Sequence, residues 1–194
     1  MSAYLHPGYL LIVIWVLWAA SWIIASVWSS RVAARPSLAR ELPNRACTII
    51  GAILLTGRYH FPGWPQLWAL SDTDAWFALA ALLGGIAFAW WARVTLGALW
   101  SGNVTRKEDH RIVDTGPYGV VRHPIYTGIL LGVWGTALFL GRWETLLGAL
   151  LMTIGFWLKA KLEESFLVAG LGEAAYADYK RRVPMLLPLA KGWG

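Results

Sequence analysis

The chain has 194 residues, of which 57% are hydrophobic and only 14% are charged, and its mean hydropathy is +0.50. This composition excludes a soluble domain and indicates an integral membrane protein of one domain, with 14 tryptophans suited to the water–lipid boundary. The net charge of +6 then indicates cytoplasmic loops beside anionic lipid headgroups rather than a nucleic-acid partner.

Three apolar segments in the first half of the chain, residues 1–96, are expected to cross the membrane and to shape the access of a lipid. The first, 9–28, has about twenty residues, enough to cross ~30 Å of hydrocarbon at ~1.5 Å per residue. A basic loop follows, in which Pro43 is expected to prevent a helix. The shorter run 46–61 and the full-length run 75–96 give the second and third spans.

The second half, residues 97–194, alternates polar and apolar segments. Residues 97–124 are polar, and so long a loop in a small membrane protein is expected to be functional. Two apolar runs within 125–158 are joined by Gly141 and Arg142 alone, which predicts a tight helical hairpin. A last helix is expected at 173–182, with an acidic start and a basic end that suit its dipole. Small residues should let the two arms of the hairpin approach closely, namely Gly128, Gly132, Gly135, Gly148 and Gly155.

The distribution of positive charge predicts the orientation of this all-α membrane fold. Fifteen of the 17 lysines and arginines fall in the basic loop after the first span, in the long polar loop or in the C-terminal tail. Because positively charged loops stay in the cytoplasm, the chain is expected to cross about five times, with its N-terminus outside and its C-terminus in the cytoplasm. The long loop and the tail then share the cytoplasmic face, where their polar groups can form a cofactor pocket.

The stretch from His110 to Tyr126 is not explained by hydrophobicity, because it concentrates imidazoles, arginines, a Gly-Pro turn and two tyrosines. Pro124 at the first position of a helix leaves backbone N–H groups free to bind an acceptor. Glu163 and Glu164 lie at a membrane boundary, where carboxylates are costly unless they bind a cation or water. A ligand with a carboxylate, an adenine ring and two positive charges matches both features, and S-adenosyl-L-methionine is such a ligand.

Other chemistries lack their motifs. The chain has no glycine-rich phosphate loop, no dinucleotide-binding fingerprint and no nucleophile elbow. With Cys47 as the single cysteine, it has neither an intrachain disulfide nor a cysteine-based metal cluster. His110 and His123 lack a plausible third ligand nearby, so no metal site is expected.

Five blocks of sequence together resemble a known family. They are Asp-His-Arg-Ile-Val at 109–113, Gly-Pro-Tyr at 116–118, Val-Arg-His-Pro-Ile-Tyr-Thr-Gly at 121–128, Glu-Glu at 163–164 and Tyr-Lys-Arg-Arg-Val-Pro at 179–184. They resemble the integral membrane methyltransferases of the isoprenylcysteine carboxyl methyltransferase and phospholipid methyltransferase group. The resemblance covers the C-terminal half and implies S-adenosyl-L-methionine as cofactor. It also implies methyl transfer to a lipophilic, membrane-embedded acceptor, with an isoprenylcysteine-like carboxylate as first choice and a phospholipid amine as the alternative.

The resemblance also implies roles for individual residues. Lys159 stands where the family has an arginine that meets the substrate carboxylate, and lysine keeps the charge without the bidentate fork. A carboxylate acceptor needs no base, whereas an amine would need Glu164 or His123 to take its proton. The residues implied to contact the cofactor are Asn103, His110, Arg111, Ile112, Val113, Tyr118, His123, Pro124, Ile125, Tyr126 and Glu163.

Several of these residues also have plainer explanations. His123 could cap a helix, the tyrosines could be interface anchors, and the two glutamates could pair with Lys159 or Lys161. Arg122 is expected to be structural and to pair with a phosphate or with Asp114. A nicotinamide-dependent membrane reductase and a non-enzymatic membrane scaffold stay open as other classes of function, and the sequence leaves the acceptor and the oligomeric state open.

Overall fold

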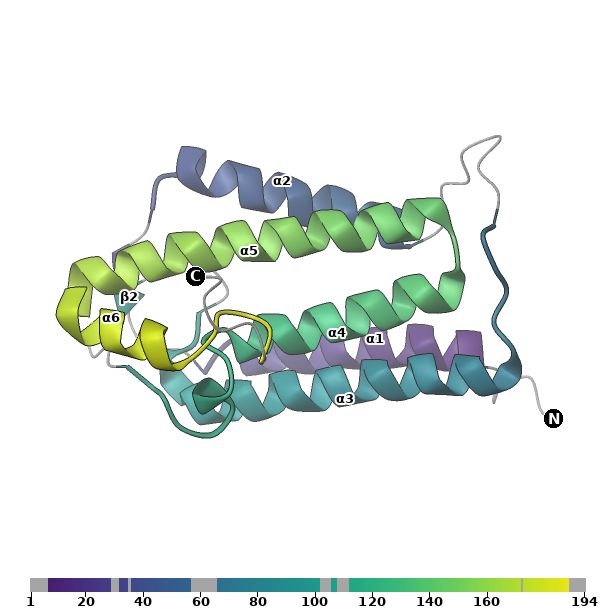
Figure 1. The fold of residues 1–194 in the computed structure, drawn as a ribbon, viewed down its shortest axis with the longest axis horizontal. Coiled ribbons are helices and arrows are strands. Elements are labelled where there is room, and N and C mark those ends of the chain that lie inside the picture. The colour runs from purple at the N-terminus through teal and green to yellow at the C-terminus, as the bar shows by residue number, and fades with distance from the viewer. Residues whose placement is uncertain are drawn as a thin grey trace.

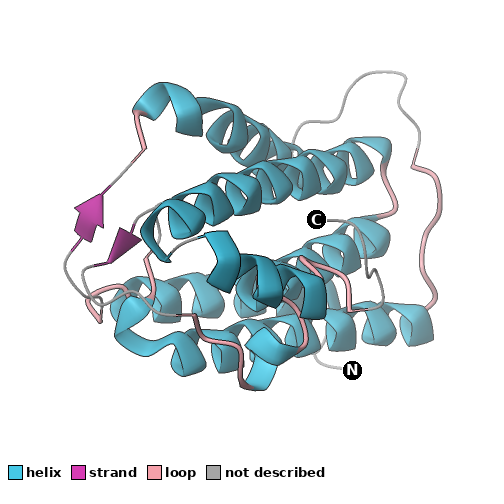
Figure 2. Cartoon of the chain, turned by 60° about the vertical axis from the view of Figure 1, so that its left-hand side comes forward, coloured by secondary structure: helices cyan, strands magenta, loops and turns pink. Residues whose placement is uncertain are grey.

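The computed structural model of the chain describes residues 7–28, 32–34, 36–56, 66–101, 106–107, 112–171 and 173–188. Five long helices lie roughly side by side, and a short sixth helix packs at one end of them (Figures 1 and 2). The helices are α1 (Pro7–Ala25), α2 (Leu38–Leu55), α3 (Asp72–Leu96), α4 (Pro124–Leu140), α5 (Trp143–Leu171) and α6 (Glu173–Arg182). Shorter elements are the strands β1 (Val32–Ala34) and β2 (Arg106–Lys107) and the 3-10 turns η2 (Gly97–Leu99) and η3 (Gly116–Gly119).

Three helices of the described chain are long and apolar enough to cross a membrane, which confirms an integral membrane protein. They are α1, α3 together with the turn that follows it, and α5 as far as residue 169. Helix α4 is equally apolar but has only 17 residues. Helix α2 is less apolar because its first half carries charged side chains, among them Arg40 and Glu41.

The prediction that Pro43 lies in a loop is wrong. Helix α2 begins at Leu38 and includes Pro43. A proline removes one backbone hydrogen bond, but here the carbonyl that loses its partner lies in the first turn of the helix. Side chains stabilise this polar start, since Glu41 pairs with Arg45 one turn along and Arg40 lies 5.4 Å over the ring of Phe166 on α5. Because this helix start contains charged residues and a proline, no apolar run in the sequence indicates it.

The hairpin of α4 and α5 is confirmed, but its glycines do not face each other. Gly128 packs against Gly85 of α3, whereas a Cβ on Gly148 would lie 2.7 Å from the carbonyl oxygen of Gly51 on α2. Each arm of the hairpin therefore packs closely with a different helix, giving the pairs α3 with α4 and α2 with α5. Small residues predicted close packing correctly, but they do not specify the partner. The remaining glycines follow the same division, with Gly132 and Gly135 facing α3 and Gly155 facing α2.

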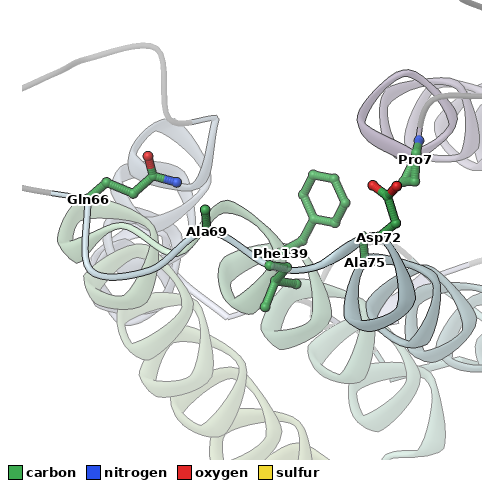
Figure 3. A pocket seen from close by; sticks show the side chains of 7 residues that line it. Pro7, Gln66, Ala69, Asp72, Ala75 and Phe139 are labelled. Carbon is green, nitrogen blue, oxygen red and sulfur yellow. The ribbon is translucent and has the colours of Figure 1, made fainter.

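The tight turn of the hairpin lies at the end of the molecule that is far from α6 (Figure 1). Gly141 adopts a left-handed conformation at φ 60°, and its carbonyl accepts a hydrogen bond from the backbone N–H of Leu67 at 2.8 Å. A cavity of about 140 Å³ lies beside this turn (Figure 3). It is lined by Pro7, Gln66, Ala69, Leu70, Asp72, Ala75 and Phe139.

Two contacts join the connecting loops at the opposite end. Strand β1, which follows α1, pairs antiparallel with β2, which follows α3, so the described chain is helical except for this pair and its loops. The strands were not predicted because they are only three and two residues long. They bring the loop after the first helix against the long polar loop.

The second contact is made by Arg93, whose side chain is fully buried near the end of α3. Its guanidinium donates to the carbonyl oxygens of Ala25 (2.8 Å), Trp28 (2.7 Å) and Gly97 (2.7 Å), so it caps the C-terminal ends of α1 and α3 together. The rings of Trp28 and Trp100 lie 5.0 and 4.5 Å from it. Because helix ends leave carbonyls without partners, one arginine here stabilises two helix ends.

Replacing Gly85 with alanine should destabilise the protein, because the added Cβ would overlap the carbonyl oxygen of Gly128 and force α3 and α4 apart. The expected loss is about 1–3 kcal/mol, measured by thermal unfolding in detergent. The matched control is Gly84→Ala on the same helix, where a Cβ meets nothing within 4 Å. That variant should be neutral or slightly stabilising, and equal losses in both variants would contradict the packing described above.

Candidate functional site

The start of α4 forms the centre of the candidate site. Pro124 is the first helical residue, as predicted, and His123 occupies the N-cap position without making a side-chain cap hydrogen bond. His123 therefore lies at the cap position, but its side chain does not cap the helix. The backbone N–H groups of Arg122 and His123 donate to the carbonyl oxygens of Pro184 (2.8 Å) and Met185 (3.1 Å). The chain after α6 thus occupies two backbone donors that directly precede the helix.

A buried ion pair joins this helix start to α5. Arg122 Nε lies 2.8 Å from Glu164 Oε1, and the two side chains are only 2% and 3% exposed. Arg122 Nη1 also donates to the carbonyl oxygen of Val183 at 2.6 Å, and Lys180 Nζ of α6 lies 3.3 Å from the second oxygen of Glu164. Three separate segments of the chain meet at these charges. Buried charges require such partners, because a charge without one is very costly in a low-dielectric interior.

The predicted pairing of Arg122 with Asp114 is wrong. Arg182 of α6 lies 3.2 Å from Asp114 instead, and hydrogen bonds from Arg182 and then Arg181 lower the pKa of the neighbouring Asp178. These contacts are exposed and screened by water, so each adds little stability. They still hold α6 beside the segment that leads into η3.

His123 lies between the two glutamates. Its Nε2 is 3.1 Å from Glu164 Oε1, and its Nδ1 is 3.6 Å from Glu163 Oε2. Tyr126 donates its hydroxyl to the other oxygen of Glu163 at 2.5 Å, and its ring is parallel to that of His123 at 5.5 Å. The two adjacent carboxylates therefore differ. Glu164 is enclosed by cations, whereas Glu163 is 21% exposed and is contacted by a tyrosine hydroxyl and an imidazole.

An apolar wall adjoins these polar groups. Tyr118, Ile125, Tyr126 and Met185 form a buried cluster with two alanines, and further side chains pack partly buried against it. These are Trp22, Leu96, Trp100, Val113, Ile129, Phe156 and Leu186. Lys159 Nζ lies 5.2 Å over the ring of Tyr126, so a cation is placed next to both the wall and the polar groups.

Helix α6 packs beside the site through two buried tyrosines, Tyr176 and Tyr179. Tyr179 donates its hydroxyl to the carbonyl oxygen of Tyr118 at 2.8 Å. Burial raises the pKa of Tyr179 above its ordinary value, so the hydroxyl keeps its proton and remains a donor. Burial also raises the pKa of Tyr118. Ile112 packs with Tyr176 and Tyr179 rather than with the apolar wall.

The structure thus brings most of the predicted residues together at the start of α4 and the end of α5. Asn103, His110 and Arg111 lie outside the described residues, so their predicted roles stay predictions. The two glutamates pair with Arg122, Lys180, His123 and Tyr126 rather than with lysines of their own helix. Within the described ranges, no three His, Cys, Asp or Glu side chains are grouped to hold a metal ion.

Sequence reasoning missed Lys180, Phe156 and the backbone of residues 183–186 as parts of the site. Lys180 and Val183 belong to the block 179–184, which was noticed but given no role. Phe156 packs its ring 5.0 Å from that of Tyr126. It is one aromatic residue in a long apolar helix, and nothing in the sequence distinguishes it from lipid-facing neighbours.

Comparison with known proteins agrees with this geometry. A sequence model described as "Phospholipid methyltransferase" matches residues 73–174, which is more than half of the chain. The chain belongs to the phospholipid methyltransferase family. The matched segment runs from the start of α3 to the start of α6 and includes the pair Arg122 and Glu164.

Curated relatives in this family have several acceptors in their names. The chain is 38% identical over 85 residues to a protein-S-isoprenylcysteine O-methyltransferase of Schizosaccharomyces pombe, covering 43% of this chain and 36% of the relative. It is 46% identical over 72 residues to methanethiol S-methyltransferase 2 of Bradyrhizobium diazoefficiens, covering 37% and 26%. It is 29% identical over 131 residues to protein-S-isoprenylcysteine O-methyltransferase B of Arabidopsis thaliana, covering 66% and 64%. The chain thus spans less than two thirds of each of these relatives.

Removing both partners of the buried ion pair should cost less stability than the sum of the two single removals. Arg122→Met leaves Glu164 buried beside fewer donors, and a loss of about 3–5 kcal/mol is expected. The double variant Arg122→Met with Glu164→Gln should lose less than the sum of the two single variants. A double-mutant cycle measured by thermal unfolding in detergent tests this, and strict additivity would show that the two side chains do not interact.

Proposed function

We propose that the protein is an S-adenosyl-L-methionine-dependent methyltransferase that acts on a lipophilic acceptor in the membrane. The observation that carries this proposal is the position of Glu163. Its partly exposed carboxylate adjoins the apolar wall. Glu163 also lies within residues 73–174, which match the phospholipid methyltransferase family. Such a carboxylate next to lipid is expected to bind a cation.

The residues of the site fit the proposed methyl donor. Glu163 offers an acceptor for an ammonium group, and Arg122 Nη2 is a buried donor with no hydrogen-bond partner in the described part of the chain. The apolar wall offers Tyr118 and Met185 for a flat, weakly polar ring. When bound, this donor supplies an electrophilic methyl group on a sulfonium.

Within this proposal, the chain positions the two reactants rather than transferring protons. An in-line approach of bound reactants removes the entropy of their encounter, which can contribute ~7–11 kcal/mol. Glu164, predicted as a catalytic candidate, accepts contacts from Arg122, His123 and Lys180. We therefore assign it a positioning role, in which it fixes His123 and, through the stacked ring, Tyr126.

The proposed acceptor is a carboxylate on an isoprenylcysteine-like lipid. Lys159 supports this choice, because its ammonium lies beside the ring of Tyr126 and can neutralise an anionic acceptor next to the apolar wall. A carboxylate is already nucleophilic and needs no base. The names of the S. pombe and A. thaliana relatives agree with this substrate class.

A small thiol is the second candidate acceptor. The relative from B. diazoefficiens, named for methanethiol, is 46% identical over its matched 72 residues. Thiols react as thiolates, and a nearby ammonium lowers the pKa of a thiol. Lys159 is therefore compatible with either anion, so the acceptor must be identified by experiment.

The proposed topology has five crossings, with the site on the cytoplasmic face. Pairing of β1 with β2 requires the loops after α1 and after α3 to lie on the same side of the membrane. Helices α2 and α3 must then either both cross or both remain on one side, and α3 is long and apolar enough to cross. This supports α2 as a span despite its charged start, and the excess of basic loop residues supports the cytoplasmic side.

The decisive experiment incubates the purified protein with radiolabelled S-adenosyl-L-methionine and total membrane lipid. We expect label in a lipid fraction, and we expect mild base to release it as methanol because a methyl ester is hydrolysed. A base-stable thioether product would favour the thiol acceptor, and base-stable label on a phospholipid amine would favour the N-methylation alternative. Absence of transfer to any fraction, with tight binding of the donor also absent, would overturn the proposal.

Glu163→Gln should weaken binding of the methyl donor about tenfold or more, because hydrogen bonds to charged groups contribute ~1.5–3 kcal/mol. Calorimetric titration with S-adenosyl-L-methionine measures this. The control is Glu144→Gln, a buried glutamate at the far end of α5, which should leave the affinity unchanged. An unchanged affinity in Glu163→Gln would remove this residue from the donor site.

Lys159→Arg should keep most of the activity toward a carboxylate acceptor, whereas Lys159→Met should raise the KM for that acceptor about tenfold or more. The physical reason is that both cations neutralise the carboxylate, and the thioether does not. Initial rates over a range of acceptor concentrations measure the effect, with the KM for the donor as internal control. If the methionine variant kept the wild-type KM, the acceptor would not be bound by Lys159.

A further inference from the structure

One face of α1 carries three tryptophans that the proposed chemistry does not use. Trp15, Trp18 and Trp22 follow at spacings of three and four residues, so they share a face of the helix. The ring centroids of Trp15 and Trp18 are 5.4 Å apart, and those of Trp18 and Trp22 are 5.3 Å apart. The ring of Trp22 also contacts those of Trp90 (5.3 Å) and Trp100 (5.7 Å). We call Trp15, Trp18 and Trp22 the tryptophan row.

The row connects the middle of the helices to the candidate site. Trp22 packs against the apolar wall around Tyr126, whereas Trp15 packs against a second buried cluster formed by α2, α4 and α5. The same partly buried side chains, Ile129, Phe156 and Leu186, contact both clusters. From Trp15 to Trp22 the helix rises about 10 Å, roughly a third of the ~30 Å hydrocarbon core.

The row is fixed in place but only partly covered. Trp15 Nε1 donates to Thr136 Oγ1 of α4 at 2.9 Å, and Arg93 caps the other end of α1. Between these fixed points all three tryptophans keep part of their surface exposed. The indole N–H of Trp18 is buried and has no hydrogen-bond acceptor in the part of the chain that the structure describes. A rigid, partly exposed aromatic surface thus lies along the part of α1 that leads to the apolar wall.

We infer that the tryptophan row is the docking surface for the apolar tail of the methyl acceptor, and that this tail is an isoprenoid chain. The inference rests on the proposed function. A surface continuous with the wall of the site and lying at the depth of the hydrocarbon suits a tail whose head reaches Lys159. The isoprenoid is favoured over a saturated acyl chain because it is the tail of the acceptor proposed above, and its double bonds can pack against the indole rings.

The test compares two prenylcysteine acceptors, one with three isoprene units and one with a single unit, in the wild type and in Trp18→Ala. For the long acceptor, this variant should raise KM about tenfold, the change expected from losing one large apolar contact, with kcat within about twofold. The tail of the short acceptor is expected to end before Trp18, so its kcat/KM should change less than about twofold. Equal losses for both acceptors would overturn the inference, because they indicate general damage to the site.

The matched control is Trp76→Ala, an exposed tryptophan near the far end of α3, which should leave both acceptors unaffected. Calorimetric binding of S-adenosyl-L-methionine by Trp18→Ala should equal that of the wild type if this variant is folded.

A second readout does not depend on activity. A photoreactive three-isoprene prenylcysteine, bound to the wild type in detergent and irradiated, should label peptides from 7–28, and Trp18→Ala should reduce that label. Label on α1 without any methyl transfer would retain the docking surface and reject the proposed function. Methyl transfer with label elsewhere would retain the function and reject the docking surface.

Discussion

The buried contact between Arg122 and Glu164 is the interaction on which the rest of the site depends. Taking two charges out of water costs several kcal/mol per ion, and this cost is offset only where further partners complete their hydrogen bonding. Here further partners come from α6 and from the segment after it, through Lys180 and the carbonyl of Val183, and Arg122 Nη2 is the donor left without one in the described part of the chain. The start of α4, the end of α5 and the C-terminal segment are therefore stable only together. Glu163, one residue from this contact, is held at the surface of a rigid assembly.

The pairing of helices explains why the site is at one end of the molecule. Small residues fasten α3 to α4 and α2 to α5, and the two pairs are joined by the tight turn at Gly141 and by the charges around Glu164. Between these ends the contacts are made by larger apolar side chains such as Phe156 and Ile129, which belong to two clusters at once. The interior between the pairs is thus apolar along its length and becomes polar at the candidate site.

Much of this arrangement was predictable from the sequence, because hydropathy and the two-residue turn define α1, α3, α4 and α5. The start of α2 was missed since charged residues and a proline form it, and their stabilising partners lie on another helix. In the site, Tyr126 and Glu163 were expected together from the family resemblance, and they share a hydrogen bond. The partner of Arg122 could not be predicted, because Glu164 is distant in sequence and closer acids were equally plausible. The contacts of residues 183–186 could not be predicted either, because they are made by backbone carbonyls, which every residue type has.

The position of Arg93 has a consequence for the assembly of the helices. Helices α1 and α3 run in the same direction, so their dipoles are aligned and the partial negative charges of their ends lie side by side, where they repel each other. A guanidinium between these ends acts as a shared counter-ion and turns the repulsion into attraction. Lysine would carry the same charge, but its compact ammonium lacks the planar fork that reaches carbonyls of both helices at once. The association of the first helix with α3 therefore combines apolar packing of Leu11 against Leu79 and Leu82 with an electrostatic contribution from Arg93 where the two helices end.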